Sequence, residues 1–283
     1  MNENEYTPLS KADYEEPQCL LIDETDGRPC GVQSIPQQRV IEKMDEYMSR
    51  RDYAGAERHL LYWREEARAG FDLRGELMVE NELVGHYRKT GEKEKAFQAA
   101  ERALELIRKL DYDGSITSGT TYVNIATMRN AFGDNETSIR FFEKARAIYE
   151  ASPMTRPALL GGLYNNMALV YVETGRYAEA YELYDKAMET MAKVEHGELE
   201  QAVTCLNRAD AVHSELGEEG EERVFELLDQ AIALLDTPSI PHNGYYAFVC
   251  EKCYPTFEYY GYFLDAERLK TTAEELYRTN REG

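Results

Sequence analysis

The sequence predicts an all-α fold, a solenoid of about six helix hairpins. Three observations predict it: a small-residue motif recurs along the chain, its copies are about 41 residues apart, and apolar residues within each copy follow the i, i+3, i+4, i+7 period of a helix. A pair of antiparallel helices cannot bury its apolar face alone, so neighbouring copies must stack. We expect a right-handed superhelix whose concave groove is lined by the first helix of each pair.

The clearest copies of the motif begin at Gly91, Gly133 and Gly175, each after an amphipathic stretch of about fourteen residues. An earlier copy begins at Arg51, and two weaker copies follow residue 201. Each glycine falls at the expected turn between two helices, where a left-handed backbone is cheapest for glycine. In a common register the copies start near residues 37, 77, 119, 161, 202 and 247.

Small and aromatic residues recur at fixed positions in these copies: Tyr87, Gly91, Ala96 and Ala103 in one, and Ala168, Tyr171, Gly175, Tyr177, Ala180, Tyr184 and Ala187 in another. This pattern resembles the tetratricopeptide repeat (TPR). Three copies depart from it: the first has Leu60 and Trp63 in place of the later aromatic residue and alanine, another has Arg129 in place of an aromatic residue, and the fifth has Arg208 at a usual core position. The repeat is longer than the standard length of about 34 residues, which makes it similar to kinesin light chain and to the bacterial peptide-sensing TPR regulators.

The net charge excludes several classes of partner. The chain has 32 Lys and Arg residues against 53 Asp and Glu residues, a formal net charge of −21. Proteins that follow nucleic-acid phosphates need a basic face, and anionic lipid attracts basic segments. We therefore expect no nucleic-acid partner and no membrane partner. Electrostatic steering favours a neutral or basic peptide.

The chain start and the cysteines predict a cytoplasmic location. Residues 1–17 lack the basic and apolar regions of a secretory signal, and no stretch has the roughly 18 uninterrupted apolar residues of a membrane span. The five cysteines are few and odd in number, unlike a disulfide framework.

The pattern divides the chain into an N-terminal extension, residues 1–35, and a TPR-like solenoid domain, residues 36–283. Asp26–Gly27 is a turn signal between two short apolar runs, so a small hairpin is expected there, and disorder is expected before Pro17. Ser34 and Pro36 are typical of the residues that precede a helix.

No motif indicates an enzyme, a cofactor or a metal site. Cys250 and Cys253 form a CxxC pair, but zinc needs two further ligands and a redox pair needs a preceding strand, so we expect both in the core. The five histidines have no ligand spacing such as HExxH, and phosphate-binding glycine loops and nucleophile elbows are absent from the sequence.

One pattern indicates function, the asparagine ladder formed by Asn124, Asn166 and Asn207. These residues occupy the same phase of three successive copies, although asparagine is a mediocre helix-interior residue. Their amides can bond the backbone of an extended peptide whatever its side chains, and in TPR proteins resembling this one asparagines at this position hold a peptide backbone. The alternative is that the amides bond a neighbouring helix or water. The other candidates on the groove face are Asn130, Asn165, Arg88 and His213.

The resemblance and the ladder together predict a non-catalytic scaffold that holds an extended peptide in its concave groove. The alternative function is a peptide-responsive bacterial regulator of the TPR pheromone-receptor type that lacks a DNA-binding domain, because residues 1–35 are too short for one.

Overall fold

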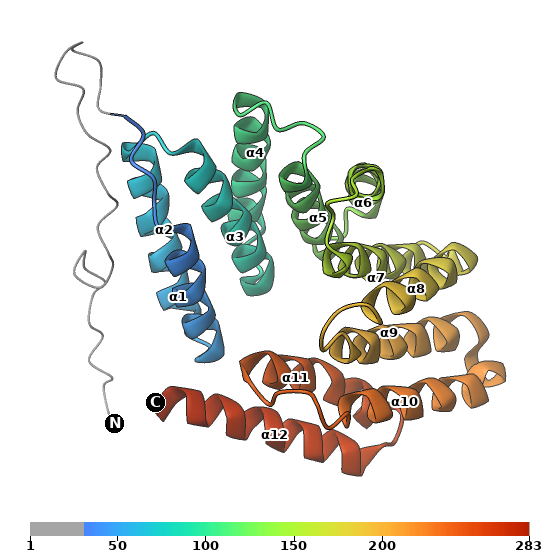
Figure 1. Ribbon diagram of the computed structural model, residues 1–283. Helices are drawn as coiled ribbons and strands as arrows, with labels where there is room; N and C mark the ends of the chain where they lie inside the picture. Colours follow the sequence, from blue (N-terminus) through green and yellow to red (C-terminus); the bar gives the residue numbers. More distant parts are fainter. Residues whose placement is uncertain (1–30, 283) are drawn as a thin grey trace, which may run out of the picture. The chain divides into compact units, whose positions relative to one another are not determined.

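The computed structural model describes residues 31–282, with side chains described to residue 279 (Figure 1). Every regular element in this part of the chain is a helix, and it contains no strand, which confirms the predicted fold class. The hairpin predicted around Asp26–Gly27 lies outside the described residues. The chain divides after Asp113 into two compact units, the N-terminal unit and the C-terminal unit.

The helices follow one another in pairs. The N-terminal unit contains α1 (Gln37–Ser49), α2 (Tyr53–Ala69), α3 (Leu73–Thr90) and α4 (Lys93–Lys109). The C-terminal unit contains α5 (Ile116–Ala131), α6 (Asn135–Ala151), α7 (Pro157–Glu173), α8 (Tyr177–Met191), α9 (Glu198–Leu216), the 3₁₀ helix η2 (Gly217–Gly220), α10 (Glu221–Leu235), α11 (Gly244–Tyr259) and α12 (Phe263–Glu282).

Each predicted repeat is one helix hairpin, and the two helices of a pair pack together: α1 with α2, α3 with α4, and so on to α11 with α12. Within the C-terminal unit the first helices of the pairs, α5, α7, α9 and α11, also contact one another in order. They therefore form one continuous layer of that unit, while α6 and α8 pack against the hairpin that follows (Figure 1).

The turns inside the hairpins confirm the glycine prediction. Gly91, Gly133 and Gly175 have φ angles of 76°, 81° and 74°, in the left-handed region that glycine adopts without strain. Their backbone N–H groups bond carbonyls of the last turn of the preceding helix, which satisfies groups that the helix end leaves unpaired. Arg51, in the turn between α1 and α2, and Phe71, in the connection between α2 and α3, take the same conformation with φ angles of 56° and 55°.

Aspartates are the N-cap residues of several helices. The Asp52 side chain accepts a hydrogen bond from the Gly55 N–H at 2.7 Å, and Asp72 accepts one from the Gly75 N–H at 2.9 Å. These contacts satisfy backbone donors that the first turn leaves unpaired. Asp72 also accepts a hydrogen bond from the Ile35 N–H at 3.0 Å, so it ties the segment before α1 to the start of α3.

The core combines small and aromatic side chains in the way that the repeat predicts. Facing helices approach at small residues, and aromatic side chains fill the spaces opposite, so Phe142 and Tyr184 are fully buried. The ring of Tyr149 lies so close to Gly119 that a Cβ atom there would be 2.5 Å from it. The alanines that carried the resemblance have no exposed surface: Ala96, Ala103, Ala168, Ala180 and Ala187.

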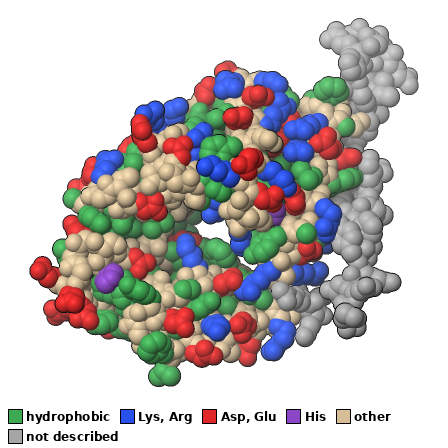
Figure 2. All heavy atoms as spheres, turned by 180° about the vertical axis from the view of Figure 1, so that it is seen from behind, with side chains coloured by type: hydrophobic (Ala, Val, Ile, Leu, Met, Phe, Trp, Pro, Cys, Tyr) green, Lys and Arg blue, Asp and Glu red, His purple; other side chains and the backbone are tan. Residues whose placement is uncertain are grey.

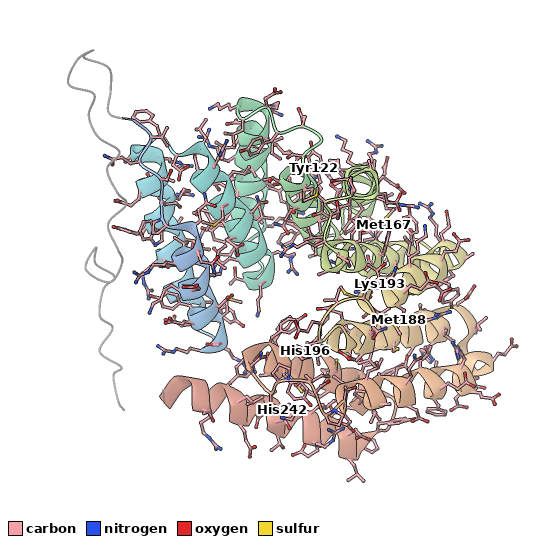
Figure 3. All side chains as sticks on the ribbon, viewed as in Figure 1. Tyr122, Met167, Met188, Lys193, His196 and His242 are labelled. Atoms are coloured by element: carbon pink, nitrogen blue, oxygen red, sulfur yellow. The ribbon has the colours of Figure 1, made fainter. Side chains whose placement is uncertain are left out.

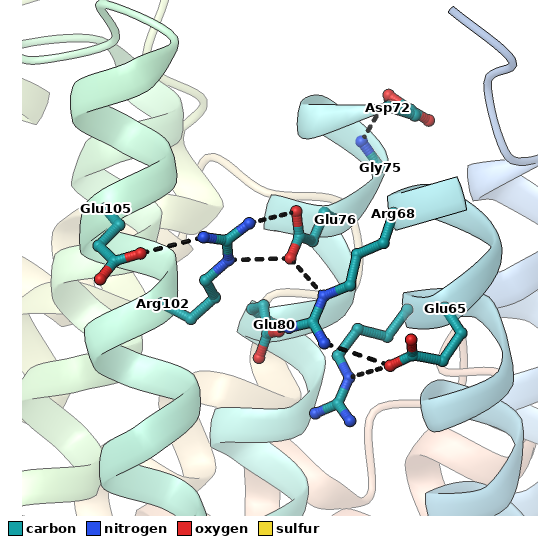
Figure 4. A network of polar contacts seen from close by, with 9 residues as sticks. Glu65, Arg68, Asp72, Gly75, Glu76, Glu80, Arg102 and Glu105 are labelled. Carbon is teal, nitrogen blue, oxygen red and sulfur yellow. Dashed lines mark hydrogen bonds and ion pairs between the residues drawn. The ribbon is translucent and has the colours of Figure 1, made fainter. Parts of the chain in front are cut away.

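Two carboxylates are buried in the N-terminal unit between α2 and α4 (Figure 4). Arg68 donates to Glu76 at 2.7 Å and to Glu80 at 3.1 Å, and Arg102 donates twice to Glu76 at 2.8 and 2.9 Å. Burial opposes the ionisation of Glu76, but the hydrogen bonds from the two arginines outweigh it and lower the pKa of Glu76. Burial dominates at Glu80 and raises its pKa to about 7.

The surface carries both signs of charge. Acidic and basic side chains are interspersed over the face that Figure 2 displays. Among the described helices, none combines the length and the apolar character that a membrane crossing requires.

Candidate peptide-binding hollow

A hollow of about 550 Å³ opens on the first-helix layer of the C-terminal unit. It is formed by α7, α9 and α11 together with the turns that precede α9 and α11. We call it the α7–α9–α11 hollow. His196, which is labelled in Figure 3, lies in the turn before α9 and lines the hollow. Its polar lining residues include Asn165, Asn166, Glu200, Asn243, Tyr245 and Lys252.

Asn166 is the residue of the predicted ladder that reaches this hollow. It lies midway along α7 and is partly exposed. Its side-chain amide has no hydrogen-bond partner among the described residues, so one acceptor and two donors face the open space. Gly162, one turn earlier on the same helix, also lines the hollow. It has no side chain, and apart from its chain neighbours and the local helix backbone no atom lies within 4 Å of the position a Cβ would take, so the space beside the amide is open.

Three further polar groups surround the same space from α9 and α11. Tyr245 donates its hydroxyl hydrogen bond to the Glu200 carboxylate. Burial raises the pKa of Glu200, an effect that the nearby Lys252 ammonium opposes. Lys252 forms no ion pair within the described residues. The Asn243 side-chain oxygen Oδ1 caps α11 by accepting from the Tyr245 and Tyr246 N–H groups at 2.9 and 3.1 Å, which fixes this asparagine at the rim.

Two of the predicted amides bind each other. The Asn207 Nδ2 on α9 donates to the Asn165 Oδ1 on α7 at 3.1 Å, and Asn165 is 5% exposed. This pair ties the two helices together beside the hollow. Asn124 lies at the equivalent place on α5 and is half-buried.

The remaining predicted residues lie elsewhere. Asn130, at the end of α5, donates to Asn135 at 3.1 Å and to Glu173 at 2.6 Å. His213 is exposed on α9 and contacts Tyr259 near the end of α11, with 3.4 Å between the tyrosine hydroxyl and Nε2. At about 1.5 Å per residue, the thirteen residues from Glu200 to His213 place this histidine roughly 20 Å from the hollow. Arg88 is exposed on α3 in the N-terminal unit.

Glu200 and Asn243 are two of the lining residues that the repeat pattern did not single out. Both lie at the N-terminal end of the first helix of a pair: Glu200 is in the first turn of α9, and Asn243 is the N-cap of α11. The signal for Asn243 is its type and place, since asparagine directly before an apolar helical stretch is a strong N-cap. Glu200 has no comparable signal, because its role depends on contact with Tyr245, 45 residues later.

The cysteines of the C-terminal unit confirm the prediction for the CxxC pair. Cys250 and Cys253 are buried in the core that α9, α10, α11 and α12 share, and so is Cys205. Burial raises the pKa of Cys250 to about 11 and that of Cys253 to about 12. A thiol with such a pKa is almost entirely protonated near neutral pH and is a poor nucleophile or metal ligand.

Tetratricopeptide-repeat family models match residues 76–151 and residues 161–195. Both matched ranges are tetratricopeptide repeats. The matched ranges contain α3 to α6, apart from the first residues of α3, and most of the α7–α8 hairpin. The remaining hairpins have the same architecture. The two arginines at unusual positions each form an ion pair: in the matched α5–α6 hairpin Arg129 binds Asp134 at 2.6 Å, and in the unmatched α9–α10 hairpin Arg208 binds Asp185 of α8 at 2.6 Å. The family identified from the small and aromatic residues is therefore confirmed.

Solved structures of TPR proteins share this fold. The Rap protein in complex with competence and sporulation factor matches with a TM-score of 0.56 and 17% identity, over 88% of this chain and 67% of that one. Kinesin light chain nearly identical TPR-like repeats from Podosopora anserina match with a TM-score of 0.50 and 17% identity, over 73% of this chain and 97% of that one. No curated protein sequence matches the chain.

Proposed function

We propose that this TPR protein is a scaffold that binds an extended peptide segment of a partner in the α7–α9–α11 hollow. The observation that carries the proposal is the Asn166 amide, which lines the hollow and has no hydrogen-bond partner within the described part of the chain. A free side-chain amide on an open helical surface can donate to a peptide carbonyl and accept from a peptide N–H at the same time. TPR proteins as a class bind proteins or peptides, and the function is binding rather than catalysis.

The other polar groups of the hollow select the peptide. Lys252 offers a cation and Glu200 a carboxylate from neighbouring helices, and the Tyr245 ring, half exposed, offers an apolar face. The net charge of −21 favours a neutral or basic segment through long-range attraction. Asn124 and Asn207 extend the contact along the layer of first helices, although Asn207 must share its amide with Asn165.

A second candidate function is a peptide-responsive regulator of the pheromone-receptor type. The observation that favours it is the likeness to the Rap protein, whose structure was solved with competence and sporulation factor bound. In such a regulator, peptide binding changes the packing of one hairpin on the next and so alters a second contact surface.

The binding proposal is tested with an array of extended peptides of varied charge, followed by isothermal titration of the peptides that bind. Asn166→Ala should weaken binding by roughly 1–2 kcal/mol, about 5- to 30-fold, because it removes hydrogen bonds to the peptide backbone. The matched control is Asn81→Ala on α3, whose amide donates to the Leu77 carbonyl of its own helix at 3.0 Å. Equal affinities for wild type, Asn166→Ala and the double variant with Asn207→Ala contradict the proposal.

The regulator differs from the simple scaffold in one measurable way. A regulator changes its small-angle scattering profile or its hydrogen-exchange pattern away from the hollow when peptide binds, whereas a rigid scaffold is protected at the contact alone. Hydrogen exchange with and without a bound peptide separates the two functions.

A further inference from the structure

We propose that the N-terminal unit binds a divalent transition metal ion of the Zn²⁺ class between Glu57, His86 and Glu92, here called the Glu57–His86–Glu92 cluster. One ligand atom of each residue lies within 4.8 Å of the other two. The three come from different places: Glu57 from α2, His86 from the last turns of α3, and Glu92 from the cap of α4. An imidazole nitrogen with carboxylate oxygens is a ligand set that Zn²⁺ and its neighbours accept, whereas Ca²⁺ and Mg²⁺ prefer oxygen alone.

The unpaired Nδ1 atom of the buried His86 ring is an independent observation that points to a bound ion. The residue is 4% exposed, and its Nδ1 atom is buried with no hydrogen-bond partner among residues 31–279. Buried polar atoms are nearly always paired, because an unpaired one loses its hydration without compensation. His59, the other buried histidine of this unit, does have a partner, since its Nε2 lies 2.9 Å from the Val40 carbonyl oxygen. A metal ion bound to the His86 ring would give it the polar partner it lacks.

The two carboxylates are held in place by hydrogen bonds of their own. The Tyr87 hydroxyl donates to the Glu57 Oε1 at 3.1 Å. The Thr90 hydroxyl lies 3.2 Å from both the Glu92 Oε1 and the His86 carbonyl oxygen, so it links two of the ligand residues across the α3–α4 turn. Such outer contacts orient ligands in metal sites. Ligand atoms around a tetrahedral Zn²⁺ lie roughly 3.4 Å apart, so small rotations of the glutamate side chains complete the geometry.

A lysine already holds the two carboxylates together. The Lys95 Nζ atom lies 2.8 Å from the Glu57 Oε1 and 2.6 Å from the Glu92 Oε2. Its side chain is 48% exposed and flexible, so it can swing into solvent when another cation arrives. A divalent ion carries twice the charge and can also coordinate the imidazole, whose buried Nδ1 accepts no hydrogen bond from the ammonium in the described part of the chain. Lys95 and the metal therefore compete for one position, and removing the lysine should strengthen metal binding.

The test uses the full-length protein, freed of metal with a chelator and then titrated with Co²⁺ and Zn²⁺. Visible absorption follows Co²⁺ and calorimetry follows Zn²⁺. We expect one bound equivalent with the weak visible bands of nitrogen and oxygen ligands. His86→Gln and Glu92→Gln should each weaken binding at least tenfold, while Lys95→Met should strengthen it roughly tenfold. Glu92 caps α4 without a side-chain hydrogen bond to its first turn, so its variant should fold normally.

The control variant is Glu65→Gln, which removes an exposed carboxylate of the same helix α2 that binds Arg64 and Arg68. Its metal affinity should equal that of the wild type. The proposal is overturned by undetectable binding of both metals at millimolar concentration, or by unchanged affinity in Glu92→Gln. Weaker or equal binding by Lys95→Met also overturns it. Strong near-ultraviolet charge-transfer absorption that persists in His86→Gln would place the metal on thiols instead.

Discussion

Replacing Glu80 by glutamine should change the pH dependence of unfolding in the N-terminal unit. Glutamine keeps the shape and an acceptor for Arg68, but it cannot ionise. The Glu80 side chain is 1% exposed, and its pKa rises from the usual 4.5 to about 7 because burial disfavours the charged form more than Arg64, Arg68 and Arg102 favour it. The folded protein therefore holds a proton between these two values that the unfolded chain releases.

The sign of the effect follows from proton linkage. An acid with a raised folded pKa stabilises the fold fully below pH 4.5, and this contribution is lost as the pH rises through 7. The shift of about 2.5 units corresponds to roughly 3 kcal/mol in total, of which roughly 2.5 kcal/mol falls between pH 5 and pH 8.5. Relative to wild type, Glu80→Gln should therefore gain roughly 2.5 kcal/mol of unfolding free energy across that range.

The assay is urea unfolding followed by tryptophan fluorescence. The chain has one tryptophan, Trp63, which is buried on α2 beside Arg64, so the signal reports on the N-terminal unit. Burial lowers the pKa values of His59 and His86, so their contribution to the pH dependence of stability has the opposite sign. They contribute equally to both proteins, so the difference between variant and wild type isolates Glu80.

A matched variant separates burial from loss of the ion pair. Glu65 also binds Arg68, at 3.2 Å, but its side chain is 63% exposed. Glu65→Gln should differ from wild type by less than about 1 kcal/mol, with no trend between pH 5 and pH 8.5. The reasoning is refuted if the difference between Glu80→Gln and wild type is constant over this range, or if it becomes less favourable as the pH rises.

Two further predictions concern the C-terminal unit. Gly119→Ala should lower stability by roughly 1–3 kcal/mol because its Cβ would meet the Tyr149 ring, whereas Gly162→Ala, with open space around it, should raise stability by roughly 0.5–1 kcal/mol. Thermal unfolding followed by circular dichroism measures both variants. Equal shifts of the unfolding midpoint in the two variants would contradict the close packing of Tyr149 on Gly119. In a chain with Cys19→Ser and Cys30→Ser, the three remaining buried thiols should react with a disulfide reagent at pH 8 only after denaturant is added. Rapid labelling of the native protein would show that this core opens readily.

The helix pattern could be predicted from the sequence because it depends on local chemistry. Gly91, Gly133 and Gly175 lie at left-handed turns as expected, since only glycine adopts that backbone without strain. The burial of Cys250 and Cys253 follows from their phase on an amphipathic helix. These inferences need only the period of the helix and the identity of the nearest residues.

The neighbouring asparagines mark the limit of that reasoning. Asn165 and Asn166 are adjacent in the sequence, yet Asn165 is buried against Asn207 while Asn166 faces the α7–α9–α11 hollow. Successive residues point about 100° apart around a helix, so the orientation of α7 about its own axis decides which of the two amides is buried against α9. The packing of α7 against α8 and α9, which the repeat pattern does not specify at this accuracy, sets that rotation.

Local sequence was enough to establish that this chain forms stacked helix hairpins, because helix period, turn glycines and buried alanines act over a few residues. Long-range packing decided which polar groups meet. Glu200 reaches Tyr245 across 45 residues, and Glu57 reaches Lys95 across 38. Such contacts depend on where separate helices come to rest against one another, and no spacing along a single helix encodes that.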